Sequence, residues 1–212
     1  MRAVIFDLDG VLIDSEPVWE RVRRGYVAET GGGWQPDSQQ RLMGMSTGEW
    51  ARYLSVELGV PHPPERVATD VVERMARSYD DGLPLLPGAV DAVRRAADRY
   101  PLGLASSSPR RLIDTVLTEA GLTPLFAVTL STEEVPRGKP FPDVYLAVAA
   151  KLGVAPRDCV AVEDSSNGLR SAHAAGMRVV AVPHTAYPPA PDALALADRI
   201  VTRLDDLFVA TG

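Results

Sequence analysis

Two aspartates, Asp7 and Asp9, follow a short apolar run near the start of the chain, in the stretch VIFDLDGVLIDSEP. Burying a carboxylate is costly unless it is paired with a cation or bound to a metal. The apolar residues 3–6 have the character of a buried strand, so the pair must be compensated by a cation. A carboxylate held in this way can attack phosphorus, and a second carboxyl group beside it can transfer protons.

Further polar side chains follow other apolar runs. Ser106 ends the run LGLAS, and Glu163 and Asp164 end the run CVAVED. The carboxyl ends of parallel strands meet at one edge of a sheet, where ligands bind. We therefore expect these side chains to converge on Asp7 and Asp9, although about 150 positions separate them along the chain.

Converging carboxylates repel one another, and a hard divalent cation with oxygen ligands relieves the repulsion. We expect Mg²⁺, held by the side chains of Asp7 and Asp164, with Glu163 as an outer ligand. Such a site usually holds a phosphate, because the ion keeps positions open for phosphate oxygens. Lys139, in the turn RGKPFPD, adds a cation that balances the carboxylates and holds a phosphate oxygen.

The residues after Ser106 favour anion binding. Ser107 follows it, and Ser108 and Pro109 have the pattern of an N-cap and a first helical position. A hydroxyl beside free backbone N–H groups at a helix start binds phosphate well. With Lys139 and the metal, these groups provide the positive charges and hydrogen-bond donors that phosphoryl transfer requires.

The elements that must position these residues alternate between strands and helices, which predicts a doubly wound, Rossmann-like parallel α/β sheet. Nearly continuous apolar runs are typical of strands that are buried on both faces. Apolar residues at helical spacing lie between the runs, in segments that include 109–120, 141–152 and 168–175. The predicted strands are 3–6, 102–106, 126–130, 159–164, 179–183 and 198–202.

Residues 15–83 break this alternation. They contain three stripes of apolar residues at helical spacing and no convincing strand, which predicts an α-helical bundle inserted after the first strand. We therefore expect a catalytic core of residues 1–14 and 84–212 and a helical cap of residues 15–83. Two crossing linkers make the cap a candidate mobile lid.

At this point the sequence resembles the haloacid dehalogenase superfamily of phosphohydrolases, over nearly its whole length. Its four motifs match, in order and spacing, DLDGVL (7–12), ASSS (105–108), GKPFPD (138–143) and VEDSSNG (162–168). The helical insert between the first two motifs resembles the subclass with an α-helical cap. An aspartate at position 9 implies phosphate chemistry, because a leaving alkoxide needs a proton and a halide does not.

The resemblance implies a role for each motif residue. Asp7 is the nucleophile, and Asp9 is the acid and base and also binds magnesium through its backbone carbonyl. Ser106 and Lys139 hold the phosphoryl group, and we expect further phosphate contacts at Gly10 and Ser107. The implied metal site consists of Asp7, Asp9, Glu163 and Asp164.

The stretch DSEP at 14–17 resembles sugar-phosphate phosphatases of the β-phosphoglucomutase-like group. Where the mutase has a histidine and a cap arginine, this chain has Trp19 and Thr47. A neutral sugar or polyol monophosphate is therefore the preferred substrate class, with these two residues on the substrate side. Residues 15–83 contain no lysine, which disfavours Schiff-base chemistry. Aromatic and methionine side chains of the insert either line the pocket or pack the cap's own core: Trp19, Met43, Met45 and Trp50.

The composition of the chain narrows the remaining classes of function. The net charge is −6 with no basic stripe, which disfavours nucleic-acid binding. A single cysteine, Cys159, excludes an internal disulfide, and no apolar run reaches the 18 to 20 or so residues that a membrane span requires. We expect a cytoplasmic enzyme, a monomer or weak homodimer, acting on a small phosphorylated molecule. The alternatives are a phosphomutase and a non-catalytic protein that binds a phosphorylated metabolite.

Overall fold

The computed structural model describes residues 1–42 and 45–207. Its internal contacts divide the chain into two compact units, an α/β unit of Met1–Asp14 with Pro84–Gly212 and a helical unit of Ser15–Leu83. Among the described residues, no helix is both long enough and apolar enough to cross a bilayer.

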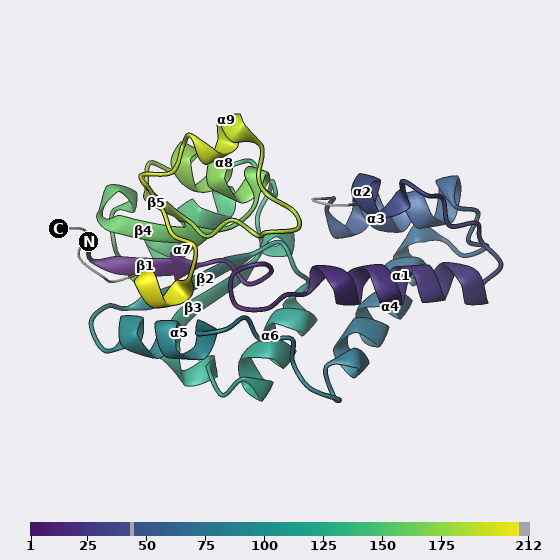
Figure 1. The fold of residues 1–212 in the computed structure, drawn as a ribbon, viewed down its shortest axis with the longest axis horizontal. Coiled ribbons are helices and arrows are strands. Elements are labelled where there is room, and N and C mark those ends of the chain that lie inside the picture. Colours follow the sequence, from purple (N-terminus) through teal and green to yellow (C-terminus); the bar gives the residue numbers. More distant parts are fainter. Residues whose placement is uncertain (43–44, 208–212) are drawn as a thin grey trace. The chain divides into compact units, whose positions relative to one another are not determined.

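The α/β unit is built on a six-stranded, fully parallel sheet in the order β3-β2-β1-β4-β5-β6 (Figure 1). This order reverses between β1 and β4, which is where ligands bind in doubly wound sheets. The predicted fold class of the core is therefore confirmed. The strands are β1 (Ala3–Phe6), β2 (Leu102–Ser106), β3 (Phe126–Ser131), β4 (Cys159–Glu163), β5 (Arg178–Ala181) and β6 (Arg199–Ile200).

Helices cover both faces of the sheet (Figure 1). One face carries a continuous apolar cluster in which alternate strand residues such as Ile5 and Ala161 pack against Val148 and Leu169. This alternation follows from the two-residue period of a strand. The helices of the α/β unit are α5 (Ala89–Ala97), α6 (Arg110–Glu119), α7 (Asp143–Leu152), α8 (Ser166–Ala174) and α9 (Pro191–Leu194).

The element bounds differ from the sequence prediction in a few places. The strands 3–6 and 102–106 are as predicted, whereas β4 ends at Glu163, so that Asp164 begins the following loop. Helix α5 was not predicted, because its buried face consists mainly of small alanines, which give a weak apolar signal. Its signal was the helical spacing of Ala89, Ala92, Val93 and Ala96, which are all buried.

The start of α6 is a correction to the predicted cap. The helix begins at Arg110, and Pro109 precedes it with an extended ψ of 144°. Ser108 is therefore not the N-cap, and its hydroxyl donates to Asp9 instead, at 2.7 Å. A serine can satisfy either a helix end or a nearby carboxylate, and here the carboxylate is its partner.

The helical unit contains α1 (Glu16–Glu29), α2 (Ser38–Leu42), α3 (Thr47–Arg52), a π-helical turn (Tyr53–Glu57) and α4 (Pro64–Ser78). None of its described residues, 15–42 and 45–83, lies in a strand. Its core includes the predicted stripes, with Val67, Val71 and Met75 fully buried. The buried Tyr26 hydroxyl donates to Asp70 at 2.9 Å and ties α1 to α4.

The two ends of the helical unit attach to hydrogen-bonded neighbours within the α/β unit. The Asp14 N–H donates to the Pro84 carbonyl at 2.8 Å, and the Leu86 N–H donates to the Leu12 carbonyl at 2.9 Å. An antiparallel bridge joins Ile13 to Leu85 between them. The chain therefore leaves and re-enters the α/β unit at one place.

Candidate active site

The sheet brings the predicted polar residues to one edge. Strand β1 lies between β2 and β4, so its carboxyl end is flanked by theirs. Asp7 directly follows β1, Ser106 is the last residue of β2, and Glu163 is the last residue of β4. Lys139 reaches the same edge from the turn that precedes α7. The topology thus assembles side chains from four distant segments.

Lys139 is the cation at the centre of this edge. Its Nζ donates to Asp7 Oδ1 at 2.9 Å, to Glu163 Oε1 at 2.6 Å and to the Ala105 carbonyl at 3.0 Å. The lysine side chain is only 4% exposed. Three acceptors use all three of its N–H donors, so the ammonium is fixed in position.

Glu163 is the most enclosed carboxylate of the site, with a side chain that is 0% exposed. Besides Lys139, the Tyr145 hydroxyl donates to its Oε1 at 2.7 Å. The other oxygen, Oε2, accepts from the Asp164 N–H at 3.1 Å and from the Ser165 hydroxyl at 3.2 Å. Both oxygens are therefore engaged by donors of the protein itself.

Asp164 completes the acidic group. Ligand oxygens of Asp7, Glu163 and Asp164 lie within 4.8 Å of one another. Among the described residues, Asp164 Oδ1 is buried and has no hydrogen-bond donor. A Cβ on Gly10 would lie 1.9 Å from Asp164 Oδ2, and Gly10 has a φ of 77°. Only glycine fits this position, where the backbone closes around the carboxylate.

Burial and mutual repulsion set the charge state of this cluster. Burial first, and then the charge of Glu163, raise the pKa of Asp7 to about 8 despite the attraction of Lys139. The same two causes raise the pKa of Asp164 well above its ordinary value. Burial alone would lower the pKa of Lys139, but Asp7 and Glu163 outweigh it and raise that pKa.

These observations fit a hard divalent cation. A buried carboxylate oxygen that lacks a donor needs either a proton or a cation, and clustered oxygen ligands suit Mg²⁺. Asp7 and Asp164 offer oxygens for it, whereas both oxygens of Glu163 are already engaged. The residues present are thus compatible with the magnesium that the sequence predicts.

Asp9 lies beside two serine hydroxyls. Its Oδ2 accepts from Ser106 Oγ at 3.2 Å and from Ser108 Oγ at 2.7 Å. Ser106 is fully buried and also accepts from the Ser108 N–H at 2.9 Å. Ser131 Oγ donates to the Ser108 carbonyl at 2.7 Å and holds this turn in place. Of the predicted serines, Ser107 is exposed.

The helical unit carries the other residues that were predicted to contact the substrate. Trp19 packs against Trp50 with their ring centroids 5.8 Å apart, and both are buried. Thr47 is the first residue of α3 and is half-buried, as is Met45. Met43 lies outside the described residues.

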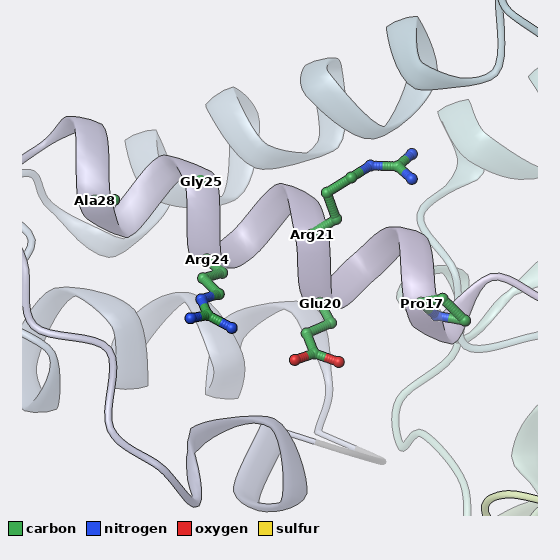
Figure 2. Close-up of a pocket in the computed structure, with 6 residues that line it drawn as sticks. All are labelled: Pro17, Glu20, Arg21, Arg24, Gly25 and Ala28. Atoms are coloured by element: carbon green, nitrogen blue, oxygen red, sulfur yellow. The ribbon is translucent and has the colours of Figure 1, made fainter.

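A groove of about 460 Å³ also runs along α1 in the helical unit. Figure 2 shows Glu20 and Arg24 pointing to the same side of the helix, with Arg21 pointing to another. The groove contains neither Trp19 nor Thr47. Its lining residues are Pro17, Glu20, Arg21, Arg24, Gly25 and Ala28.

Comparison with known proteins decides the family. Residues 1–176 match the model of the haloacid dehalogenase-like hydrolases. Hexitol phosphatase B of Escherichia coli is 40% identical over 187 residues, which cover 85% of this chain and 83% of that protein. A phosphorylated carbohydrates phosphatase of Thermotoga maritima is 34% identical over 187 residues, 87% of each chain.

The chain belongs to the haloacid dehalogenase-like hydrolase family. The predicted family and enzyme class are thereby confirmed. The fold agrees as well, since the crystal structure of CbbY from Rhodobacter sphaeroides in complex with phosphate matches with a TM-score of 0.87. That match covers 98% of this chain and 96% of CbbY at 27% identity.

Three polar contacts of this haloacid dehalogenase-like hydrolase were not predicted from its sequence. Tyr145 lies within the predicted helical segment 141–152, and its hydroxyl donates to Glu163. Ser108 was predicted as a helix cap but donates to Asp9, and Ser131, one residue beyond the predicted strand 126–130, donates to the Ser108 carbonyl. The available signal was polarity at buried positions, because a buried hydroxyl must find a partner.

Proposed function

We propose that the protein is a magnesium-dependent phosphatase that hydrolyses a small phosphorylated metabolite, a sugar or polyol monophosphate, through an aspartyl phosphate. One observation carries the proposal. Lys139 donates at once to Asp7, Glu163 and the Ala105 carbonyl, beside a buried Asp164 oxygen that lacks a donor among the described residues. A fixed cation next to uncompensated carboxylates is suited to binding a phosphoryl group and a metal.

Asp7 and Asp164 would hold the magnesium through their side chains, and Asp9 through its backbone carbonyl. Glu163 would stay in the outer shell, since both of its oxygens accept bonds from the protein. When bound, the ion would neutralise the carboxylates and the phosphoryl oxygens. Lys139 would supply the second positive charge at the phosphoryl group, with Ser106 and the N–H groups near Gly10 and Ser107 as further donors.

In the first step, an Asp7 oxygen forms a bond to phosphorus and the ester P–O bond breaks. The leaving alkoxide takes a proton from Asp9, so that an alcohol is released and the aspartyl phosphate remains. The hydroxyls of Ser106 and Ser108 hold the Asp9 carboxyl group at the strand edge for this transfer.

In the second step, Asp9 takes a proton from a water molecule, and the water oxygen attacks phosphorus. The bond between Asp7 and phosphorus breaks, which restores the carboxylate and releases inorganic phosphate. Asp9 thus returns to the protonated state in which it began. Lys139 stays bonded to Asp7 or to the phosphoryl group throughout.

The relatives support the substrate class. Two of them are named as phosphatases of a hexitol phosphate and of phosphorylated carbohydrates. We propose that the helical unit is the cap that selects the substrate, with Trp19 and Thr47 on the substrate side. We also propose a cytoplasmic protein, monomeric or weakly dimeric, in keeping with its single buried cysteine.

The test is the release of inorganic phosphate from a panel of phosphorylated metabolites, with Mg²⁺ and with EDTA. We expect release to be highest with one sugar or polyol phosphate and to be lost in EDTA. Asp7→Asn should abolish turnover and leave the protein folded, whereas the exposed Asp114→Asn should retain full activity. Residual turnover in Asp7→Asn would exclude Asp7 as the nucleophile.

The same assay separates the alternatives. Substrate loss without a matching release of phosphate would indicate a phosphomutase. Binding of a phosphorylated metabolite with no turnover of any compound would indicate a non-catalytic protein.

A further inference from the structure

The Glu163 carboxylate is saturated with hydrogen bonds. Oε1 accepts from Lys139 and Tyr145, and Oε2 accepts from the Asp164 N–H and the Ser165 hydroxyl. The Ser165 N–H lies 3.4 Å from Oε2 as well. A carboxylate offers about four lone-pair positions. Each of them is therefore satisfied by a donor of this chain.

The same carboxylate is confined by the backbone of α8. A Cβ added to Gly168 would lie 1.9 Å from Glu163 Oε1 and 2.0 Å from Oε2. Ser165 caps this helix by accepting from the Gly168 N–H at 3.1 Å. The positive end of the helix dipole therefore favours the negative charge of Glu163 at this place.

Tyr145 approaches Glu163 from the segment that also carries Lys139. It lies in the first turn of α7, six positions after the lysine, and its side chain is fully buried. The Lys139 ammonium lies 5.1 Å from the centre of its ring. The segment itself is braced, because Ser171 Oγ donates to the Phe141 carbonyl at 2.6 Å.

We propose that Tyr145 is a positioning residue of the active site, which fixes Glu163 so that this carboxylate holds Lys139 against Asp7 rather than binding the metal. The inference deepens the proposed function and rests on it. Without the Tyr145 hydroxyl, one lone pair of Glu163 Oε1 would lose its donor, and the carboxylate could turn toward the Mg²⁺ ion. Lys139 would then lose its fixed place, and the phosphoryl group would lose a directed donor.

The experiment compares two conservative variants of buried tyrosines. Tyr145→Phe removes the hydroxyl that donates to Glu163. Tyr26→Phe removes a hydroxyl that donates to Asp70 in the helical unit, so it is a matched control for the loss of a buried hydrogen bond. Calorimetric titrations with Mg²⁺ alone, and with inorganic phosphate at saturating Mg²⁺, are run on the full chain. Thermal unfolding reports whether each variant is folded.

We expect Tyr145→Phe to weaken phosphate binding about tenfold, the effect of one hydrogen bond to a charged group. Its affinity for Mg²⁺ should stay within about twofold of the wild type or become tighter, because Glu163 becomes available to the ion. Tyr26→Phe should change neither affinity by more than about twofold. If the Tyr145 hydroxyl served only the stability of the fold, the two variants would change these affinities alike.

Three results would overturn the inference: unchanged phosphate affinity in Tyr145→Phe, an equal loss in Tyr26→Phe, or a parallel loss of Mg²⁺ affinity. If Tyr145→Phe does not fold, Glu163→Gln provides the test, and its phosphate affinity must fall further than its Mg²⁺ affinity. The titrations do not depend on turnover. A wild type that binds phosphate but releases none from the panel would therefore refute the proposed function and leave this inference to be judged separately.

Discussion

Among the residues that the structure describes, each unit buries one strongly basic side chain, and the surroundings of the two differ. In the α/β unit, Lys139 is held by directional hydrogen bonds to two carboxylates and a carbonyl. In the helical unit, the Arg23 guanidinium lies 4.5 Å from the ring centre of Trp19 and 5.3 Å from that of Trp50. Directional hydrogen bonds fix the Lys139 ammonium at a point, and the two rings give the planar Arg23 guanidinium an extended surface to stack on. We therefore expect the Lys139 charge to serve catalysis and the Arg23 charge to serve packing of the helical unit.

Exchanging each cation for methionine tests this comparison and gives the largest expected effect. Lys139→Met should reduce phosphate release by at least about 10²-fold to 10³-fold, as the loss of a key electrostatic contact does. It should also lower the Tm by about 10 °C, because a buried ion pair loses one partner. Arg23→Met should retain activity within about tenfold, since a flexible apolar chain can replace its packing.

Both variants are measured by phosphate release and by thermal unfolding. If Arg23→Met loses as much activity as Lys139→Met while remaining folded, the charge of the helical unit is catalytic too, and the comparison fails.

The acidic cluster of the α/β unit should make the stability of the protein depend on pH, an effect of intermediate size. The pKa of Asp7 rises from 3.8 in a free side chain to about 8 in the fold. Between these values the folded protein binds more protons than the unfolded chain, so its stability falls as pH rises. In EDTA, we expect the Tm of the wild type to decline from about pH 4 to about pH 8. The Tm of Asp7→Asn should decline less steeply over the same range.

Thermal unfolding at a series of pH values measures this slope, and saturating Mg²⁺ is the control. The ion should flatten the slope by compensating the carboxylates. A wild-type Tm that rises over this range in EDTA would contradict the charge balance described for the site.

Two helical glycines provide the smallest effects and oppose each other in sign. In the α/β unit, Gly168→Ala would place a Cβ against the Glu163 carboxylate, at a cost of about 1–3 kcal/mol. In the helical unit, Gly25 has open space at its Cβ and lies within α1, beside the groove of Figure 2. Gly25→Ala should stabilise the protein by about 0.5–1 kcal/mol.

Denaturant unfolding of the two variants measures these free energies. Equal destabilisation by both would mean that the space around Gly168 is not specifically occupied by the carboxylate.

The sequence predicted the parts of the α/β unit in which apolar runs and motifs coincide. Asp7 and Glu163 could be placed because each stands at the end of a buried strand, and strand ends of a parallel sheet converge. Lys139 could be placed only through its motif, since a lone lysine in a turn carries no such information.

The rest depended on contacts that a single sequence does not encode. Tyr145 shares a helix face with Val144 and Val148, so its ring indicates core packing, and only the fold shows that its hydroxyl meets Glu163. Ser108 could have capped a helix or bound a carboxylate, and local sequence does not distinguish the two. The roles of Trp19 and Thr47 stay predictions.

The junction around Asp14 and Pro84 has a consequence for how such a chain can change over time. Backbone hydrogen bonds from Asp14 to Pro84 and from Leu86 to Leu12 close the chain at this junction. For the sheet, the whole helical unit is therefore equivalent to a tight turn between two paired segments. Loop-closure entropy rises only slowly with the length enclosed. Segments of other lengths and shapes can therefore be exchanged at this junction while the sheet edge that carries Asp7 and Glu163 is retained. On the proposed function, this would let substrate preference change independently of the reaction chemistry.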